Sequence, residues 1–302
     1  NGCFNMCHYK GVPNDQDLSD SLHLARCAVN AEMMQWGKHH IDKTYSSKTV
    51  HIVGGGIGGM EAARVLKLRG HKPVIHEKSN ELGGAFIAAS AESYKGKLRD
   101  LLAWYKRQMK ELDIEVRLGD EVKDVSTFGG DPVIVATGAV PRVLRRVPGN
   151  EKMVEACDFL LGKKDVGETV AVIGGGLTGC EIAYELALHG KKPIIVEMKD
   201  DLVAQKGVCL ANSSYLREWF ALNEVPVYLE TALKEVKDGA IVCAGKDGSD
   251  FELACDSVIS CAGYIPAPLT EKRSGVQLIG DCRAVGNLRS VVWEAYEAAM
   301  KI

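Results

Sequence analysis

Two copies of one glycine-rich segment constrain the fold of this chain more than any other feature of its 302 residues. The first copy, residues 50–77, has a short β-branched run, a glycine turn, a helical pattern and a second apolar run that ends at Glu77. Shifting every position by 120 gives the second copy, which ends at Glu197. Repetition at one fixed offset indicates an internal duplication of a strand, turn, helix and strand unit. Further matched pairs are Glu61 with Glu181, Leu66 with Leu186, Gly70 with Gly190, and Pro73 with Pro193.

The turn of each copy contains the pattern G-x-G-x-x-G, whose three glycines have separate physical duties. The first allows a tight turn, the second lets backbone approach a pyrophosphate, and the third lets the helix pack closely on the strand. The helix N-terminus supplies N–H groups and partial positive charge for phosphates, and the final carboxylate accepts from ribose hydroxyls. A lone pattern also fits a turn that serves packing alone, but two complete copies predict two dinucleotide sites. Their residues are Gly54, Gly56, Gly59 and Glu77 in the first, and Gly174, Gly176, Gly179 and Glu197 in the second.

The carboxylate of Glu197 favours one nicotinamide nucleotide over the other. At the end of the second strand of such a unit, a carboxylate accepts from a free 2′-hydroxyl and repels a 2′-phosphate. We therefore expect the second site to prefer NADH. Three basic residues, Lys191, Lys192 and Lys199, lie near enough in sequence to keep NADPH open as the alternative.

Small residues mark further places where backbone would approach a bound group. Asp281, which ends a strand pattern ahead of a helical pattern from about Ser290, would accept from a polyol hydroxyl such as flavin ribityl, or cap the helix. The places are Lys78 with Gly83 and Gly84, Ala136 with Thr137 and Gly138 after the apolar run 133–135, Gly263 after the run 256–261, and Gly280 with Asp281 after the run 276–279.

The order of these segments predicts an α/β fold with two Rossmann-like dinucleotide-binding domains, the second inserted in the first. Residues 48–162 would form the first part of the first domain, 163–265 the second domain, and 266–302 a segment that returns to the first. Residues 1–47 would be a cysteine-containing linker. A helical pattern from about Tyr94 to Leu112 has apolar residues spaced for one buried face, with its basic residues on a solvated surface.

Composition excludes several classes of function. A net charge of -3 predicts no nucleic-acid partner, and no apolar run approaches the ~20 residues of a membrane helix. Ten cysteines at scattered spacing are typical of reduced thiols in the cytoplasm rather than of a secreted disulfide framework. The first residue, Asn1, is neither an initiator Met nor part of a signal peptide pattern, so we expect a longer chain upstream.

Three cysteines precede the first glycine turn: Cys3, Cys7 and Cys27. They fit either a plain linker or a partial iron–sulfur segment, because thiolates are soft ligands suited to iron. A 4Fe–4S cluster takes four thiolates. The fourth would have to lie before Asn1.

Assembled, these residues resemble the two-dinucleotide flavoprotein fold, and more closely the C-terminal half of the NADH:flavin oxidoreductase family that includes 2,4-dienoyl-CoA reductase, 2-enoate reductase and trimethylamine dehydrogenase. The resemblance covers essentially the whole chain. Its specific signal is the family's C-x2-C-x3-C segment followed by C-x-V-N, which binds a 4Fe–4S cluster. Cys3 and Cys7 match the second and third cysteines, and residues 27–30 match the fourth motif.

The resemblance implies FAD in the first site, NADH in the second, and an upstream TIM barrel that carries FMN and the substrate. Electrons would pass from NADH to FAD, to the cluster, to FMN and to an activated double bond or similar substrate. FAD accepts a hydride and releases single electrons, which suits this path. The chain departs from the family by a longer interval between Cys7 and Cys27, and by Ala85 and Phe86 after the paired glycines, which puts flavin contacts there in doubt.

Two alternatives stay open, and a third lacks the motif that it needs. A disulfide reductase of the same fold needs C-x4-C or C-x-x-C near the flavin, and neither occurs, since Cys255 and Cys261 have five residues between them and are predicted to be core residues. A glutamate-synthase-type small subunit usually carries more cysteines ahead of the fold. A non-catalytic module would hold ADP in the first site, as trimethylamine dehydrogenase does. The sequence leaves open the substrate and whether chains associate into a homo-oligomer.

Overall fold

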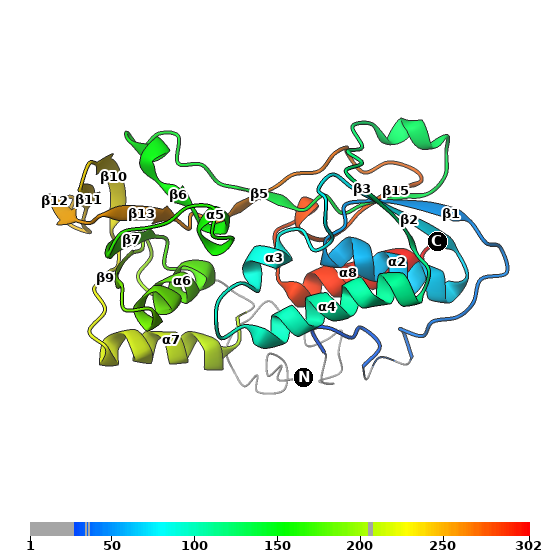
Figure 1. Cartoon of the computed structure of the whole chain (residues 1–302), viewed down its shortest axis with the longest axis horizontal. Helices are drawn as coiled ribbons and strands as arrows, with labels where there is room; N and C mark the ends of the chain where they lie inside the picture. Colours follow the sequence, from blue (N-terminus) through cyan, green and yellow to red (C-terminus); the bar gives the residue numbers. More distant parts are fainter. Residues whose placement is uncertain (1–26, 34, 36, 205–207) are drawn as a thin grey trace.

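A computed structural model of the chain describes residues 27–33, 35, 37–204 and 208–302. Cys3 and Cys7, two of the three predicted cluster ligands, lie outside the described residues. The described residues build two five-stranded parallel sheets, each with helices on one face (Figure 1). None of the helices in this part of the chain is long and apolar enough to span a membrane.

The first sheet has the strand order β15-β4-β1-β2-β3, all parallel. Its central strands are buried, as expected for a parallel sheet covered on both faces, with Ile52, Ile75 and Ile134 fully enclosed. The strands are β1 (Thr49–Val53), β2 (Lys72–Glu77), β3 (Glu115–Leu118), β4 (Val133–Val135) and β15 (Val276–Leu278). The last of these returns from the far end of the sequence, as predicted.

Helices α2, α4 and α8 lie along one face of this sheet (Figure 1). Helix α2 (Ile57–Arg69) packs against α8 (Leu288–Met300) and α4 (Gly96–Glu111), and the short α3 (Phe86–Ala89) precedes α4. Buried Leu102, Tyr105 and Met109 form the predicted apolar face of α4. Its start differs from the expectation: Tyr94 lies before the helix, because residues up to Lys95 contact the second domain.

The opposite face of the first sheet carries an unusual pair of histidines beneath residues 119–131. His51 on β1 and His76 on β2 approach Nδ1 to Nε2 at 2.9 Å, and His76 Nδ1 lies 2.7 Å from Asp120. Phe128, in the short 3-10 helix Val125–Phe128, stacks on His51 with ring centroids 4.0 Å apart. These contacts fasten the 119–131 segment to the sheet.

The second sheet repeats the arrangement, with order β6-β13-β7-β8-β9. Helices α6 (Leu177–Leu188) and α7 (Leu210–Leu222) cover one face, with Phe220 and Ile182 in the core between them and the sheet. An antiparallel sheet, β10-β11-β12, covers the other. The strands are β6 (Val154–Glu155), β7 (Thr169–Ile173), β8 (Lys192–Val196), β9 (Val227–Tyr228), β10 (Ala232–Lys237), β11 (Ala240–Ala244), β12 (Asp250–Ala254) and β13 (Ser257–Ser260). Strand β6 is part of this sheet, and the following α5 (Ala156–Leu160) packs against it. The second domain therefore includes residues before the expected boundary at residue 163.

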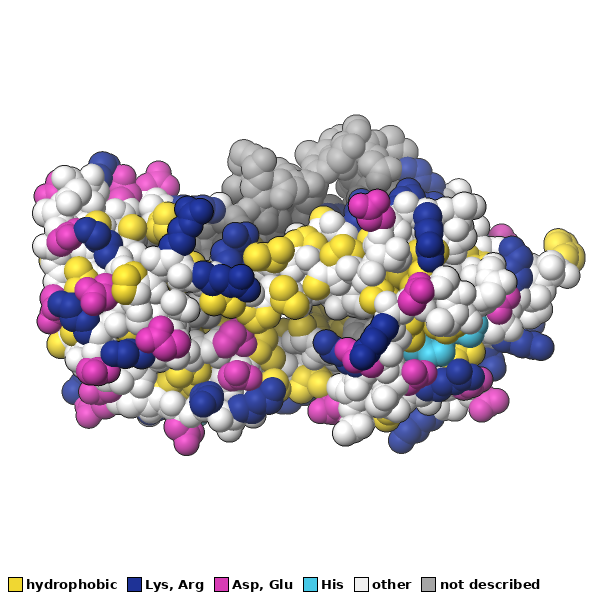
Figure 2. All heavy atoms as spheres, turned by 90° about the horizontal axis from the view of Figure 1, so that it is seen from above, with side chains coloured by type: hydrophobic (Ala, Val, Ile, Leu, Met, Phe, Trp, Pro, Cys, Tyr) yellow, Lys and Arg dark blue, Asp and Glu magenta, His cyan; other side chains and the backbone are white. Residues whose placement is uncertain are grey.

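The chain crosses between the two domains twice, and both crossings lie side by side. Strand β5 (Ala139–Pro141) leaves the first domain, β14 (Tyr264–Pro266) returns to it, and the two pair antiparallel (Figure 1). This topology confirms the predicted α/β fold with the second dinucleotide-binding domain inserted in the first. Figure 2 shows hydrophobic side chains gathered across the middle of one face, between the domains.

Candidate dinucleotide sites

Each of the three glycines in the first turn is explained by a different structural requirement. Gly54 has φ +112°, and a side chain there would overlap the Ala136 carbonyl. A side chain at Gly59 would overlap the Gly54 carbonyl, so this glycine lets α2 approach β1. Gly56 caps α2 with φ -72°, a conformation open to any residue, and a Cβ there would have only the Gly83 carbonyl oxygen nearby, at 3.9 Å. The space above Gly56 therefore fits a pyrophosphate at the helix N-terminus.

Glu77 lies beside this turn at the end of β2. One carboxylate oxygen accepts from the Gly55 amide and the other from the Ser79 amide, each at 2.7 Å. The side chain is buried, while Lys78 beside it is exposed. Because an ionised carboxylate has about four acceptor positions, Glu77 keeps capacity for ribose hydroxyls. This geometry fits the predicted role of Glu77 as the acceptor for ribose hydroxyls. The cofactor contact of Lys78 stays a prediction.

The paired glycines after Glu77 pack against the first turn. Gly83 donates to the Gly55 carbonyl at 2.9 Å and has φ +132°. Gly84 has φ +54°, and a side chain there would come within 3.3 Å of the Gly56 Cα. Both glycines have a positive φ, a backbone conformation that other residues rarely adopt. The loop that contains them packs directly against the first glycine turn.

The remaining predicted residues of the first site come together at the carboxyl ends of neighbouring strands β1, β4 and β15. Ala136 donates to Val53 at 2.8 Å, Thr137 Oγ1 donates to the Ala267 carbonyl at 2.7 Å, and Gly138 has φ +73°. The amide of Gly280 donates to Glu294 on α8 at 2.9 Å. Parallel strands present such ends along one edge, where ligands bind in open α/β sheets.

Asp281 takes a different local role from the one expected for a helix cap. The N-cap of α8 is Asn287, whose side chain accepts from Ser290. Asp281 instead accepts from the Gly286 amide at 3.0 Å, and burial raises the pKa of its carboxyl group. The interpretation of Asp281 as the α8 cap was wrong. Because the Gly286 amide contacts Oδ1, the other oxygen could accept from a polyol hydroxyl, and that contact stays a prediction.

The second site reproduces the first. Gly174 has φ +112°, Gly176 caps α6 with φ -69°, and a side chain at Gly179 would overlap the Gly174 carbonyl. The Glu197 carboxylate accepts from the Gly175 amide at 2.6 Å and from the Lys199 amide at 2.8 Å. Gly263, with φ +87°, follows β13 at the same edge of the sheet.

Three lysines kept NADPH open as the alternative nucleotide, and two of them make contacts away from Glu197. Lys191 Nζ donates to the carbonyls of Val166 and Gly167, at 2.8 and 2.9 Å. Lys192 forms an ion pair with Glu168 at 2.6 Å. Both lie at the amino end of β8, opposite the end that carries Glu197. Lys199 alone is exposed beside Glu197.

A pocket of about 50 Å³ lies at the carboxyl end of β13, beside the start of α6. Its lining includes Arg142, which follows β5, Tyr264, which begins β14, and Glu155 at the end of β6. Sequence reasoning missed these residues, since no motif connects segments this far apart in the chain. The complete lining is Pro141, Arg142, Glu155, Ala156, Thr178, Ser260, Cys261, Gly263 and Tyr264.

Cys255 is part of the core, as predicted, whereas Cys261 is only half-buried and lines the pocket at the end of β13. Cys255 is buried, and burial raises the pKa of the Cys261 thiol well above its ordinary value. No disulfide occurs among the described residues. Cys27, the described member of the predicted cluster segment, is also buried, and its carbonyl accepts from the Trp293 indole at 2.9 Å. Within the described ranges no group of three or more metal-binding side chains is assembled.

A family model described as pyridine nucleotide-disulphide oxidoreductase matches residues 48–287. The chain belongs to this family. It is 36% identical over 284 residues to a cinnamate reductase of Clostridium sporogenes, covering 91% of this chain and 42% of that protein. It is 32% identical over 292 residues to an NADH oxidase of Thermoanaerobacter brockii, covering 92% and 44%. The chain thus spans less than half the length of these curated relatives.

Solved structures agree with this assignment. A 2-naphthoyl-CoA reductase complex has a TM-score of 0.83 at 26% identity and covers 91% of this chain and 43% of that one. Lactococcus lactis thioredoxin reductase shares the fold, with a TM-score of 0.67 at 21% identity over 84% of this chain and 97% of that one. The chain is therefore a flavin-dependent NAD(P)H oxidoreductase module related to enoate and cinnamate reductases. Membership of this family implies binding of FAD and NAD(H).

Proposed function

We propose that this chain is the electron-input half of an NADH-dependent reductase, with FAD in the first domain and NADH in the second. The observation that carries the proposal is the matched pair of turns, each with a buried or half-buried carboxylate on the adjacent amide: Glu77 on Gly55 and Glu197 on Gly175. The preference for NADH rests on Glu197 and on the engagement of Lys191 and Lys192 elsewhere.

When both are bound, NADH supplies a hydride that reduces FAD, with a proton from solvent completing the reduced flavin. The chain's own residues bind and orient the nucleotides. Gly56 and Gly176 leave room at the starts of α2 and α6, whose N–H groups would bind the phosphates. Asp281 keeps an oxygen for a polyol hydroxyl. No side chain is required as an acid or base for the hydride itself.

Beyond this half, we propose a 4Fe–4S cluster held by Cys3, Cys7, Cys27 and one upstream cysteine. The cluster would pass electrons to FMN in an upstream TIM barrel of the same protein. The names of two relatives, cinnamate reductase and 2-naphthoyl-CoA reductase, support a substrate of the enoate or enoyl type. The support for the barrel is the family resemblance together with the fraction of these relatives that this chain leaves unmatched.

The decisive experiment is an anaerobic ultraviolet-visible spectrum of the full-length protein and of this chain, after mixing with FAD and then with NADH. We expect a bound flavin band that NADH bleaches, faster than NADPH does. Flavin binding without bleaching would contradict the assignment of the second site. A colourless protein that binds ADP would replace the proposal with the non-catalytic nucleotide-binding module.

A further inference from the structure

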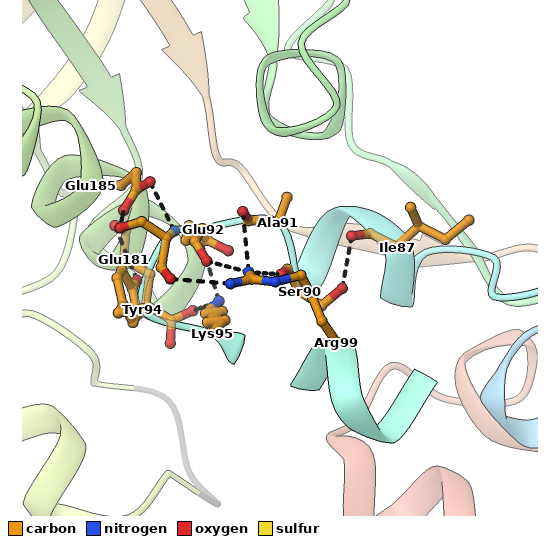
Figure 3. Close-up of polar contacts among 10 residues, drawn as sticks. Ile87, Ser90, Ala91, Glu92, Tyr94, Lys95, Arg99, Glu181 and Glu185 are labelled. Carbon is orange, nitrogen blue, oxygen red and sulfur yellow. Dashed lines mark hydrogen bonds and ion pairs between the residues drawn. The ribbon is translucent and has the colours of Figure 1, made fainter. Parts of the chain in front are cut away.

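The two nucleotide-binding domains contact each other through a short polar segment, residues 90–95, between α3 and α4 (Figure 3). Ser93 donates to the Glu185 carboxylate from its amide at 2.9 Å and from its hydroxyl at 2.8 Å. The Tyr94 hydroxyl donates to the Glu181 carbonyl at 3.3 Å, and Lys95 Nζ pairs with the Glu181 carboxylate at 2.7 Å. Three consecutive residues of the first domain therefore hold the middle and C-terminal half of α6 in the second.

The first domain fixes the shape of this segment. Arg99 on α4 donates to the carbonyls of Ser90 and Glu92 at 2.7 Å and to that of Ser93 at 3.1 Å (Figure 3). A guanidinium has five donors in a planar fork, so one side chain orders several carbonyls at once. Arg99 is exposed, as expected, and its guanidinium also holds the segment in the form that meets α6.

The ion pair of Lys95 is shielded from water. The exposed fraction is 11% for the Lys95 side chain, 19% for Glu181 and 1% for Glu92, whose Oε1 lies 3.1 Å from the same ammonium. Lys95 thus joins a carboxylate of its own domain to one of the other domain. Salt screens such a pair far less than a surface pair, and removing one partner leaves buried charge unpaired.

The contact between residues 90–95 and α6 lies close in sequence to both glycine turns. Gly84 packs on Gly56, the chain continues through α3 into residues 90–95, and Glu181 follows Gly179 by two positions. Hydride transfer requires reacting atoms about 3–3.5 Å apart, and a displacement of about 1 Å can cost on the order of a hundredfold in rate. A contact that fixes the spacing of the turns would therefore control the rate.

We propose that Lys95 is a positioning residue, whose ion pair with Glu181 holds the second domain at the distance from the first that hydride transfer needs. This inference rests on the proposed function. Lys95 would act through α6, the helix whose N-terminus would receive the NADH phosphates in the proposed function.

The test compares full-length K95M, K95R and S93A proteins with the wild type, and uses K237M as the matched control. Lys237 pairs with Glu252 at 2.8 Å inside the antiparallel sheet of the second domain, so its ion pair crosses no domain boundary. The measurements are FAD content, the NADH dissociation constant, the rate of flavin reduction at saturating NADH, and hydrogen exchange of residues 90–95 and α6.

K95M should slow flavin reduction about tenfold or more, with unchanged FAD content and NADH affinity and with faster exchange in both segments. K95R should stay close to the wild type because it keeps charge and reach, S93A should show a smaller change in the same direction, and K237M should show none. A wild-type rate and exchange pattern in K95M would overturn the proposal, as would loss of FAD in step with loss of rate. If NADH does not reduce FAD in the wild type, the proposed function fails, and hydrogen exchange alone decides whether Lys95 holds the domains together.

Discussion

The amide of Gly55 donates to the buried carboxylate of Glu77 at 2.7 Å, across the turn that joins β1 to α2. The same carboxylate accepts from Ser79, so it orders both the turn and the loop that leaves β2. A charged acceptor on two backbone amides is a strong arrangement, since hydrogen bonds to charged groups contribute about 1.5–3 kcal/mol each. Glu77, which would face the ribose, therefore also stabilises the backbone on both sides of its proposed site.

Replacement E77Q should weaken both FAD binding and the stabilisation of the turn. The amide of glutamine offers only one acceptor oxygen and places its NH₂ group against a backbone N–H donor. We expect FAD affinity to fall at least tenfold and unfolding free energy to fall by about 1–3 kcal/mol. Fluorescence titration with FAD and chemical denaturation of the same sample would measure both. FAD affinity equal to that of the wild type would exclude Glu77 as a ribose acceptor.

Replacement G56V should abolish FAD binding while the chain still folds. The position has a negative φ and open space, so a valine would occupy the volume of the pyrophosphate without straining the backbone. Flavin absorbance after purification would report binding, and circular dichroism would report folding. G37V is the control, since no atom lies within 4 Å of a Cβ there. Undiminished flavin in G56V would place the dinucleotide elsewhere.

Replacement E197A should narrow the preference for NADH, because it removes the acceptor for the 2′-hydroxyl and the repulsion of a 2′-phosphate. The ratio of kcat/KM for NADH and NADPH should fall about tenfold. K192M should leave the ratio unchanged, since Lys192 pairs with Glu168 at the other end of β8. An unchanged ratio in E197A would show that another residue reads the ribose.

Acidification should destabilise the first domain through His51. Burial first, and His76 second, lower the pKa of His51 below its ordinary value of 6.5, although Asp131 opposes them. The unfolded chain therefore binds the proton more readily, so stability present above pH 6.5 is lost as the pH falls through the lowered folded pKa. H51Q should flatten the loss of melting temperature on acidification, and H40Q, at an exposed site, should not. Equal pH dependence in H51Q and wild type would refute the role of His51.

The sequence predicted the elements whose signals are local or repeated. The duplication gave both glycine turns and both carboxylates, because each lies within one strand, turn, helix and strand unit. Contacts set by strand register could not be foreseen: His51 pairs with Val74 and Val53 with His76, and that offset brings the two imidazoles together. The same limit applies to Lys95 and Glu181, which belong to different domains. Their meeting depends on how the domains dock, which no local pattern encodes.

Strands β5 and β14 leave and re-enter the first domain as neighbours, with Pro141 opposite Tyr264. Partners in a sheet lie about 4.7–4.9 Å apart, so a brief turn would bridge the gap if everything between them were removed. The second domain is therefore a contiguous insertion between two adjacent strands. Exchanging it with that of a relative would leave every strand of the first sheet in place, but the incoming domain would also have to present partners at positions 181 and 185 for residues 93–95.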